Sequence, residues 1–411
     1  MPARRVRLGI VFGVTALSLA LGWAQKSPCL GSWADGRQYT RLCYSDVVAL
    51  YASDDRDRGL DEDRFPYVDG QNEYPVLTGM TMWVAALPAT SYASFFLWTS
   101  VLLTGGALVT AAGLHHLVGG RALVFALAPT LVVYAFVNWD LIAVALATVA
   151  TVAYLRERDA GAGLFLGLGA AAKLYPALLV IPFALGRIRQ GRPAEARRLV
   201  LWSGGAWLAV NLPFALLGFD RWSEFFSFNS ARPADWDSLW FMAARTRGPG
   251  AWLGVLGSDG VSGFTWNVGL LNALTAVTFV VVSVLVWRAA DRRRPGFAAW
   301  TFGFPLLVLF LLTGKVYSPQ YGLWLLPWFA LALPDLRLFV AFELADVAVF
   351  VTRFQFFAGL EGVGDGLPFL AFEVAVILRA AVLVACLVAW VHRVPPRTAA
   401  APAREPELEA A

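Results

Sequence analysis

Two carboxylates flank a densely charged loop near the start of this chain. In the stretch CYSDVVALYASDDRDRGLDEDRFPYVDGQNEYP, Asp46 precedes the charged run 54–63 and Glu73 follows it. A positioned carboxylate can take the proton from an attacking hydroxyl group during group transfer. The run itself carries charges of both signs, which is typical of a solvated surface segment. Chemistry is therefore expected at the flanks of the loop rather than in its most charged part.

A lysine lies in an otherwise apolar hairpin in the middle of the chain. Lys173 stands in the turn AAKLYP, between two short apolar runs. A lysine at membrane depth costs at least about 2.5 kcal/mol on insertion scales, so its presence there favours a function. That function would be to bind a phosphate at the lipid surface. The plainer interpretation is a lysine that extends from a helix end into water.

Two further turns carry polar side chains next to apolar runs. In VNWD, Asn138 and Asp140 flank a tryptophan, and Asp140 begins the next apolar run. A carboxylate at a helix N-terminus interacts favourably with the helix dipole, so capping and ligand binding are equal explanations for Asp140. The turn KVYSPQY presents groups that suit hydrogen bonds to a sugar or phosphate, although tyrosine and glutamine are also common at membrane interfaces. Its candidate binding residues are Lys315, Ser318, Gln320 and Tyr321.

Together these groups suit a reaction in which a hydroxyl attacks and a phosphate leaves. The carboxylate takes the proton, and the cations stabilise the charge on the departing phosphate. A lipid monophosphate leaving group does not demand a divalent metal, and we expect neither a metal nor another cofactor. The acidic triplet at 61–63 lies in the densest charge run, where solvation explains it. The sequence contains no GxxxxGK loop, no HExxH and no CxxC.

Membrane helices must position these residues. The chain has 411 residues, of which 58% are hydrophobic and 15% are charged, whereas about a quarter of a soluble domain is charged. Apolar runs such as 265–287 reach the roughly 20 residues that span a hydrocarbon core of about 30 Å. We expect an all-α, polytopic membrane protein. The formal net charge of +4 is not concentrated in a basic stripe with interleaved aromatic residues, so no nucleic-acid partner is expected.

Basic residues indicate which loops face the cytoplasm, because positive charges are retained there. On this criterion the N-terminus, with Arg4, Arg5 and Arg7, and the segments 186–198 and 288–296 are cytoplasmic. About twelve helices fit between such anchors, with both termini inside and an uncleaved first helix. The expected spans are 8–24, 92–114, 121–137, 139–155, 161–172, 174–186, 197–217, 266–288, 297–314, 320–334, 336–353 and 370–391.

The same topology assigns the outer face of the membrane. It places there a large first loop, 25–91, a later loop, 218–265, and the three polar turns. The transmembrane catalytic domain is expected to cover 1–391. It is followed by a cytoplasmic tail, 392–411, which is expected to be disordered because it is rich in proline, alanine and glutamate.

The three cysteines fall in two places. Cys29 and Cys43 lie in the first outer loop, and Cys386 lies in the last helix. An oxidising extracytoplasmic compartment would allow a disulfide between Cys29 and Cys43. Two free thiols are the alternative.

Five stretches of the chain, in their order, resemble a family of integral-membrane glycosyltransferases. They are RLCYSDVVALY, PYVDGQNEYPVLTG, NWDLIAVALA, GLFLGLGAAAKLYPALL and YSPQYGLWLLPW. They look like glycosyltransferase family 87 of actinobacteria, which belongs to the GT-C superfamily. The resemblance extends from the first helix to about residue 335. Tyr175 in KLYP stands where the family frequently has threonine.

The resemblance implies a GT-C fold and a transferase acting on the outer face of the membrane. The donor would be a polyprenyl-phosphate-linked sugar, typically mannose, used with inversion and without a nucleotide sugar. The base of this superfamily lies early in the first outer loop, which corresponds to Asp46 here. Glu73 is the second candidate, as base or as acceptor-binding group, and Asp69 is the third. Lys173 would lie near the donor phosphate, and an interfacial helix would cover 74–88.

The expected partners are the polyprenyl-phosphate sugar donor, membrane lipids, and a glycolipid or glycan acceptor that the sequence does not identify. Arabinose stays open beside mannose as the donated sugar. The alternative function is a transporter or flippase of a lipid-linked intermediate, which would carry polar residues along mid-membrane helix faces and repeated halves. Here the polar residues gather at the outer turns. We therefore expect a multi-pass enzyme of the cell membrane with an extracytoplasmic active site.

Overall fold

The structure is a computed structural model, and it describes the chain except residues 1–5, 32–34, 53–64, 71, 246–265 and 394–411. The charged run 54–63 and nearly all of the expected tail 392–411 lie outside the described residues. Within them, the regular elements are helices and no β-strand occurs, which confirms the all-α prediction.

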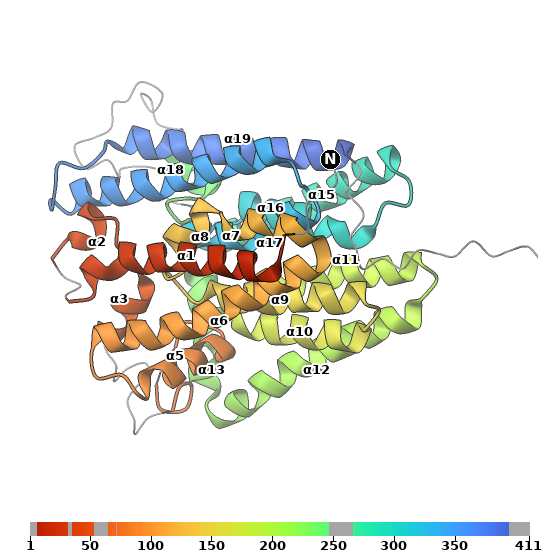
Figure 1. The fold of residues 1–411 in the computed structure, drawn as a ribbon, viewed down its shortest axis with the longest axis horizontal. Coiled ribbons are helices and arrows are strands. Elements are labelled where there is room, and N and C mark those ends of the chain that lie inside the picture. Colours follow the sequence, from red (N-terminus) through yellow and green to blue (C-terminus); the bar gives the residue numbers. More distant parts are fainter. Residues whose placement is uncertain (1–5, 32–34, 53–64, 71, 246–265, 394–411) are drawn as a thin grey trace, which may run out of the picture.

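The long helices run roughly along one direction and form a bundle, with α18 and α19 packed together on one side and α12 on the other (Figure 1). Several long helices are separated by short helical pieces. In chain order, with 3₁₀ helices written η, the elements are α1 (Leu8–Lys26), η1 (Ser27–Cys29), α2 (Arg37–Thr40), α3 (Asp46–Ala52), α5 (Val76–Ala86), α6 (Tyr92–Val118), η2 (Gly119–Ala122), α7 (Leu123–Ala126), α8 (Pro129–Tyr134), α9 (Asp140–Leu155), α10 (Asp159–Ala172), α11 (Tyr175–Arg189), α12 (Pro193–Leu217), α13 (Phe219–Ala231), α14 (Leu239–Arg245), α15 (Val268–Arg293), η4 (Ala299–Phe302), α16 (Gly303–Thr313), η5 (Pro319–Trp324), α17 (Leu326–Leu331), α18 (Leu336–Leu360) and α19 (Phe369–His392).

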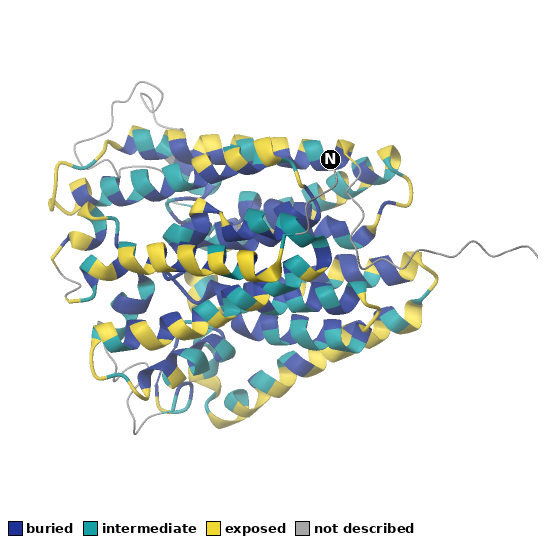
Figure 2. Cartoon of the chain, viewed as in Figure 1, coloured by how far each residue is buried: buried dark blue, intermediate teal, exposed yellow. Residues whose placement is uncertain are grey.

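The outer helices expose apolar side chains, which is stable in lipid but not in water. Exposed residues concentrate on outer helices such as α12 and α19, while the middle of the bundle is buried (Figure 2). On α15, Val277, Val280 and Leu285 are each more than half exposed. The chain is therefore a multi-pass membrane protein.

The predicted number of spans is not confirmed. In the described part, five segments are long and apolar enough to cross a membrane by length and composition. The remaining apolar helices are shorter, among them α9, α10 and α16. The five segments are Leu8–Cys29, Tyr92–Ala126, Pro193–Leu217, Val268–Arg293 and Phe369–His392.

The predicted span 121–137 is wrong as a single helix. The chain breaks between α7 and α8 because Pro129 has no amide hydrogen and disfavours helical geometry at the residue before it. Proline is well suited to the first turn of the new helix α8. A carboxylate from α18 completes this helix end, since the backbone N–H and the hydroxyl of Thr130 donate to Glu343 at 2.8 and 3.0 Å.

Other predicted boundaries also changed. The expected span 320–334 is replaced by η5 and α17, each with a proline in its first turn. The span expected at 336–353 continues as α18 to Leu360. The described part of the expected outer loop 218–265 contains two helices, α13 and α14.

The pair α10 and α11 carries the Lys173 turn into the bundle. At 1.5 Å per residue, the 14 residues of α10 extend about 21 Å, less than the hydrocarbon thickness. This helix packs closely on α12 through Gly163 and Gly167, where a Cβ atom would come within 2.2 Å of the carbonyl oxygens of Leu199 and Ser203. Such small residues allow helix backbones to approach in membranes. Lys173 consequently lies among other helices.

The first loop is folded onto the end of the bundle. Cys29 in η1 and Cys43, just before α3, form a disulfide with their Cα atoms 5.8 Å apart. A helix occupies the centre of the expected interfacial segment 74–88, as α5. The hydroxyl of Thr78 in α5 donates to the carbonyl of Ala172 at 2.7 Å. This bond holds the start of α5 beside the Lys173 turn.

Candidate functional site

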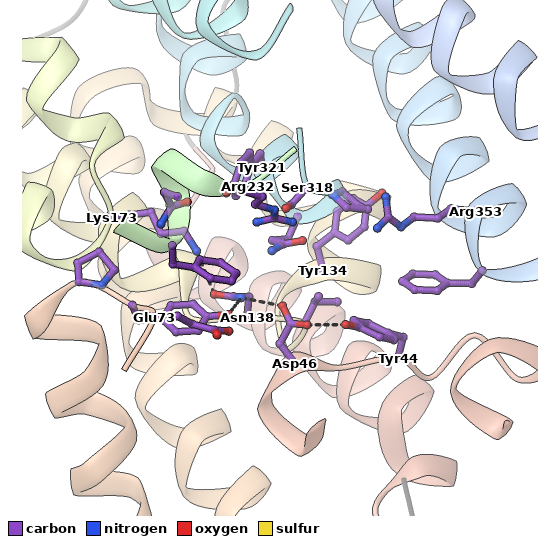
Figure 3. Close-up of a pocket in the computed structure, with 18 of the residues that line it drawn as sticks. Tyr44, Asp46, Glu73, Tyr134, Asn138, Lys173, Arg232, Ser318, Tyr321 and Arg353 are labelled. Atoms are coloured by element: carbon purple, nitrogen blue, oxygen red, sulfur yellow. Dashed lines mark hydrogen bonds between the residues drawn. The ribbon is translucent and has the colours of Figure 1, made fainter. Parts of the chain in front are cut away.

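A cavity of about 340 Å³ collects most of the polar residues singled out in the sequence. It lies where the starts of α3 and α5 meet the α8–α9 turn, the α10–α11 turn and the segment before η5. Figure 3 shows Asp46 and Asn138 at its floor, with Lys173 and Arg353 on opposite sides. The predicted residues that line it are Asp46, Glu73, Asn138, Lys173, Ser318, Gln320 and Tyr321.

Asp46 is fixed by both its backbone and its carboxylate. Its amide donates to the carbonyl of Val137 at 2.8 Å, which ties α3 to the α8–α9 turn. Its two carboxylate oxygens accept hydrogen bonds of 2.7 Å, one from the Tyr44 hydroxyl and one from the Asn138 amide. The side chain is only half-buried, so it remains accessible from the cavity. A carboxylate held in this way is oriented to accept a proton from a ligand.

Asn138 links the carboxylate to the lysine. Its Nδ2 donates to Asp46 at 2.7 Å and to the Tyr74 hydroxyl at 2.8 Å. Its Oδ1 accepts from the Lys173 ammonium at 3.0 Å and from the backbone N–H of Trp139 at 2.7 Å. The amide is buried and its orientation is determined by these four bonds. Asp46 and Lys173 are thus separated by a single asparagine side chain.

The Lys173 ammonium is held between two aromatic rings and a carboxylate. It lies 5.4 Å from the ring centre of Tyr74 and 5.6 Å from that of Tyr321. Asp140 forms an ion pair with it at 3.2 Å and also accepts from the Trp324 indole at 2.6 Å. Asp140 has no exposed side-chain surface and does not line the cavity. Its position supports Lys173 and does not offer contact with a ligand.

Lys315 also lies away from the cavity lining. Its ammonium donates to the carbonyls of Ser230 and Arg232 at 3.1 and 2.7 Å. Partial burial lowers the pKa of Lys315, and the neighbouring charge of Arg232 lowers it further. The lysine therefore holds the end of α13 and, unlike Ser318, Gln320 and Tyr321 of the same motif, does not line the cavity.

The third carboxylate considered in the first loop is not in the site. Asp69 is exposed, accepts from the backbone N–H of Phe65 at 2.9 Å, and does not line the cavity. Glu73 does line it, next to Asn138 in Figure 3. The candidates for the base are therefore Asp46 and Glu73.

The phenols beside Asp46 keep their protons. Burial raises the pKa of Tyr44 well above its usual value, and the Asp46 charge adds to the rise. Burial likewise raises the pKa of Tyr74 well above its usual value, with the charges of Asp46 and Glu73 adding to it. The Tyr44 hydroxyl therefore donates to Asp46 across the physiological pH range.

Two arginines in the lining were missed by the sequence analysis. Arg232 follows α13, and Arg353 lies in α18. With Lys173, they give the cavity lining three cations against the two carboxylates Asp46 and Glu73. An excess of positive charge suits an anionic ligand. A signal was present for Arg232, because an arginine in the expected outer loop 218–265 opposes the usual cytoplasmic bias of positive charge.

Arg353 is held by a buried chain of charges. It donates to Asp237, which also lies 3.8 Å from Arg379, and Arg379 is 3.2 Å from Asp346. Burial raises the pKa of Asp237, while Arg353 and Arg379 act against this rise. The chain connects the segment after α13 with α18 and α19 and fixes Arg353 at the edge of the cavity.

No group of three or more metal-binding side chains is found in the described part of the chain. The acidic triplet 61–63 lies outside that part.

Comparisons with known proteins give one family. The sequence model of glycosyltransferase family 87 matches residues 73–319. This range includes Glu73, Asn138, Lys173 and Ser318, whereas Asp46 precedes it. No curated protein matches the chain significantly.

Among solved structures, the chain is similar to ArnT from Cupriavidus metallidurans. The form bound to undecaprenyl phosphate is 13% identical, with a TM-score of 0.44, and the match covers 94% of this chain and 77% of that one. The apo form is also 13% identical with a TM-score of 0.44, and the match covers 93% and 76% of the two chains.

Proposed function

This chain belongs to glycosyltransferase family 87, and we propose that it transfers a sugar, most simply mannose, from a polyprenyl-phosphate donor to a lipid or glycan acceptor. The transfer inverts the anomeric centre and takes place on the extracytoplasmic face of the membrane. The donor assignment is supported by two cations that line the cavity, Lys173 and Arg232. A phosphate monoester is the anion that such a group of cations would stabilise as it leaves.

The proposed reaction is a single displacement. The acceptor hydroxyl oxygen attacks C1 of the donor sugar from the side opposite the phosphate, and its proton passes to Asp46. The bond between C1 and the phosphate oxygen breaks, and its electron pair stays on the polyprenyl phosphate. Attack from the opposite side accounts for inversion. Proton removal of this kind contributes about 10²–10⁴ in rate.

One observation carries this proposal: Asn138 joins the base candidate to the cation. Its 2.7 Å bond to Asp46 and its 3.0 Å bond from Lys173 keep the two groups at a fixed separation in one cavity. A donor sugar bound between them can place C1, the carbon that the acceptor hydroxyl attacks, near the carboxylate. Its phosphate then lies near the ammonium. Fixed positioning of this kind is a large part of catalysis.

Lys173 suits the phosphate because its counter-ion lies behind it. Asp140 is fully buried and pairs with Lys173 on the side away from the cavity lining. The ammonium has three donors, and two are used by Asn138 and Asp140. One N–H is left for a ligand. Ser318 and Tyr321, which line the same side, offer hydroxyl groups to the remaining phosphate oxygens.

The transporter or flippase alternative is less well supported. Three buried charged groups of α18 and α19 are engaged with protein groups, since Glu343 caps α8 and Asp346 pairs with Arg379. None of these three residues lines the cavity. They stabilise the packing of α8, α18 and α19 rather than mark a path through the bundle.

The test is transfer by the purified protein. Polyprenyl-phospho-mannose and polyprenyl-phospho-arabinose are each incubated with candidate glycolipid and glycan acceptors, and products are identified by mass spectrometry. Asp46→Asn should lose at least about 10² in kcat while keeping its fold. Asp69→Asn, the same change in the same loop but outside the cavity, should stay near wild type.

Transfer by Asp46→Asn at the wild-type rate would reject the base assignment. Loss of activity in Glu73→Gln instead would move that role to Glu73. No transfer from either donor to any acceptor would reject the proposed function.

A further inference from the structure

The proposed transfer uses only one side of the cavity. In Figure 3, Lys173 lies to one side of Asp46 with Tyr321 and Ser318 above it, and Arg353 lies on the other side, together with Tyr44. The side around Arg353 has no part in binding the donor phosphate. Because the base must contact the acceptor hydroxyl, the acceptor has to approach Asp46 from this second side.

The second side is built of packed aromatic rings. Tyr44 stacks on Phe354 with ring centres 4.7 Å apart and planes 23° apart. Tyr39 lies 6.4 Å from Tyr44 and 6.3 Å from Phe354, in nearly the same orientation. Phe357 meets the Tyr39 ring edge-on at 5.9 Å. All four rings line the cavity, so they present an apolar wall directly beside the carboxylate.

A guanidinium group borders this wall. The centre of the Arg353 guanidinium lies 5.0 Å from the centre of the Phe357 ring. Asp237 accepts one of its N–H groups, and Asp235 lies 3.8 Å away, beyond hydrogen-bonding distance. An arginine has five N–H donors, so several remain for a ligand in the cavity. The adjacent carboxylates balance its charge, which makes it a donor to neutral oxygen atoms more than an attractor of anions.

An aromatic wall with a few oriented polar groups is the chemistry of a sugar-binding site. One face of a pyranose ring carries C–H groups that pack on aromatic carbon, while its hydroxyls accept hydrogen bonds from fixed donors. A lipid acyl chain would make no use of Arg353. A bare phosphate would make no use of the rings.

We propose that the rings of Tyr39, Tyr44, Phe354 and Phe357, together with Arg353, form an acceptor subsite that binds a neutral sugar residue. This inference rests on the proposed function, because it takes the opposite side of the cavity as the donor side. It makes the acceptor a glycan or the sugar part of a glycolipid. Phe357 and Arg353 determine its specificity, and the hydroxyl to be glycosylated points at Asp46.

The test uses mannobiose as a soluble neutral probe with purified full-length protein. Transfer from polyprenyl-phospho-mannose to mannobiose is followed by mass spectrometry. Release of free mannose without an acceptor reports on the donor side alone. Direct binding of mannobiose is measured by equilibrium dialysis.

Phe357→Leu and Arg353→Lys should each raise the KM for mannobiose by about threefold to tenfold. Release of mannose from the donor should stay within about twofold of wild type, because neither residue lies on the donor side. Phe372→Leu is the control. This buried ring on α19 packs against Phe356 and Phe369 and does not line the cavity, so the KM should not change.

The outcomes separate the two proposals. Transfer with an unchanged mannobiose KM in Phe357→Leu overturns the subsite and leaves the function intact. Mannobiose binding that Phe357→Leu weakens, without transfer or mannose release, supports the subsite and rejects the function. Wild-type protein that binds short-chain phosphatidylglycerol but no mannobiose overturns the assignment to a sugar. Arg353→Lys can disturb Asp237, and Phe357→Leu tests the subsite without that complication.

Discussion

Replacing Asn138 with alanine should uncouple Asp46 from Lys173 without removing either group. The substitution deletes the 2.7 Å bond to the carboxylate and the 3.0 Å bond from the ammonium. Both charged groups remain, but the side chain that fixes their relative position is gone. The expected effect is on kcat more than on the KM for the donor, because positioning of the reacting groups is lost.

The size of this effect follows from the bonds that are lost. A hydrogen bond to a charged group contributes about 1.5–3 kcal/mol. The lower value applies to both bonds, since water can reach the half-buried Asp46 and Lys173 keeps its ion pair with Asp140 at 3.2 Å. The sum is about 3 kcal/mol, which corresponds to a loss of about 10² in kcat.

The assay is single-turnover transfer from polyprenyl-phospho-mannose. Asn272→Ala is the control, because this half-buried asparagine donates one 2.9 Å bond to Ser230 outside the cavity. It should change kcat by less than about twofold. Thermal unfolding in detergent checks that Asn138→Ala is folded, since the buried amide also bonds to Tyr74 and to the backbone of Trp139.

A double-mutant cycle makes the reasoning refutable. If Asn138 acts by positioning Asp46 and Lys173, its removal should cost little more once Asp46→Asn has abolished the base, so the two losses should not add. Fully additive losses would show that Asn138 acts independently of Asp46. A loss in kcat below about threefold in folded Asn138→Ala would show that the bridge does not position the reacting groups.

Three further predictions concern the lysine, the disulfide and metals. Lys173→Met should lower kcat by about 10²–10³ and reduce the free energy of unfolding by about 3 kcal/mol or more, because it leaves Asp140 buried and unpaired. Adding Asp140→Asn should restore the unfolding midpoint but not the activity. Restored activity would contradict the role of Lys173. Replacing Cys29 and Cys43 together by serine removes a cross-link with a sequence separation of 14. It should reduce the free energy of unfolding, measured by denaturant titration, by about 3 kcal/mol. An unfolding midpoint that stays the same in the variant and in reduced wild-type protein would contradict this. Extensive dialysis against EDTA should leave the transfer rate unchanged, since Lys173 and Arg232 supply positive charge to the phosphate. A loss that Mg²⁺ or Mn²⁺ reverses would contradict this.

The protein class and the set of polar candidates could be predicted from the chain alone. Apolar runs of spanning length, and polar residues that are costly to place beside them, are local properties of a sequence. They identified Asn138 and Lys173 correctly as residues at turns that meet in one cavity. The same local reasoning missed the break before Pro129. It also missed the cap on the new helix, which comes from Glu343, far along the chain.

The composition of the cavity was decided by the tertiary structure. Asp140 and Lys315 carry the same kinds of groups as the lining residues, yet one lies behind Lys173 and the other holds the end of α13. Phe354 and Phe357 enter from α18, a helix expected to end at residue 353, and they meet Tyr39 and Tyr44 from the first loop. A motif shows which side chains are available, but not where packing places them.

What the sequence by itself determined is a helical membrane protein with a family motif set and a short list of polar residues at its turns. What only the tertiary structure decided is which of these residues act together. The bond between Asn138 and Asp46 joins residues 92 positions apart. No local pattern encodes such a bond, because it depends on the mutual packing of α3, α8 and α9, which is specified by contacts distributed over the whole bundle.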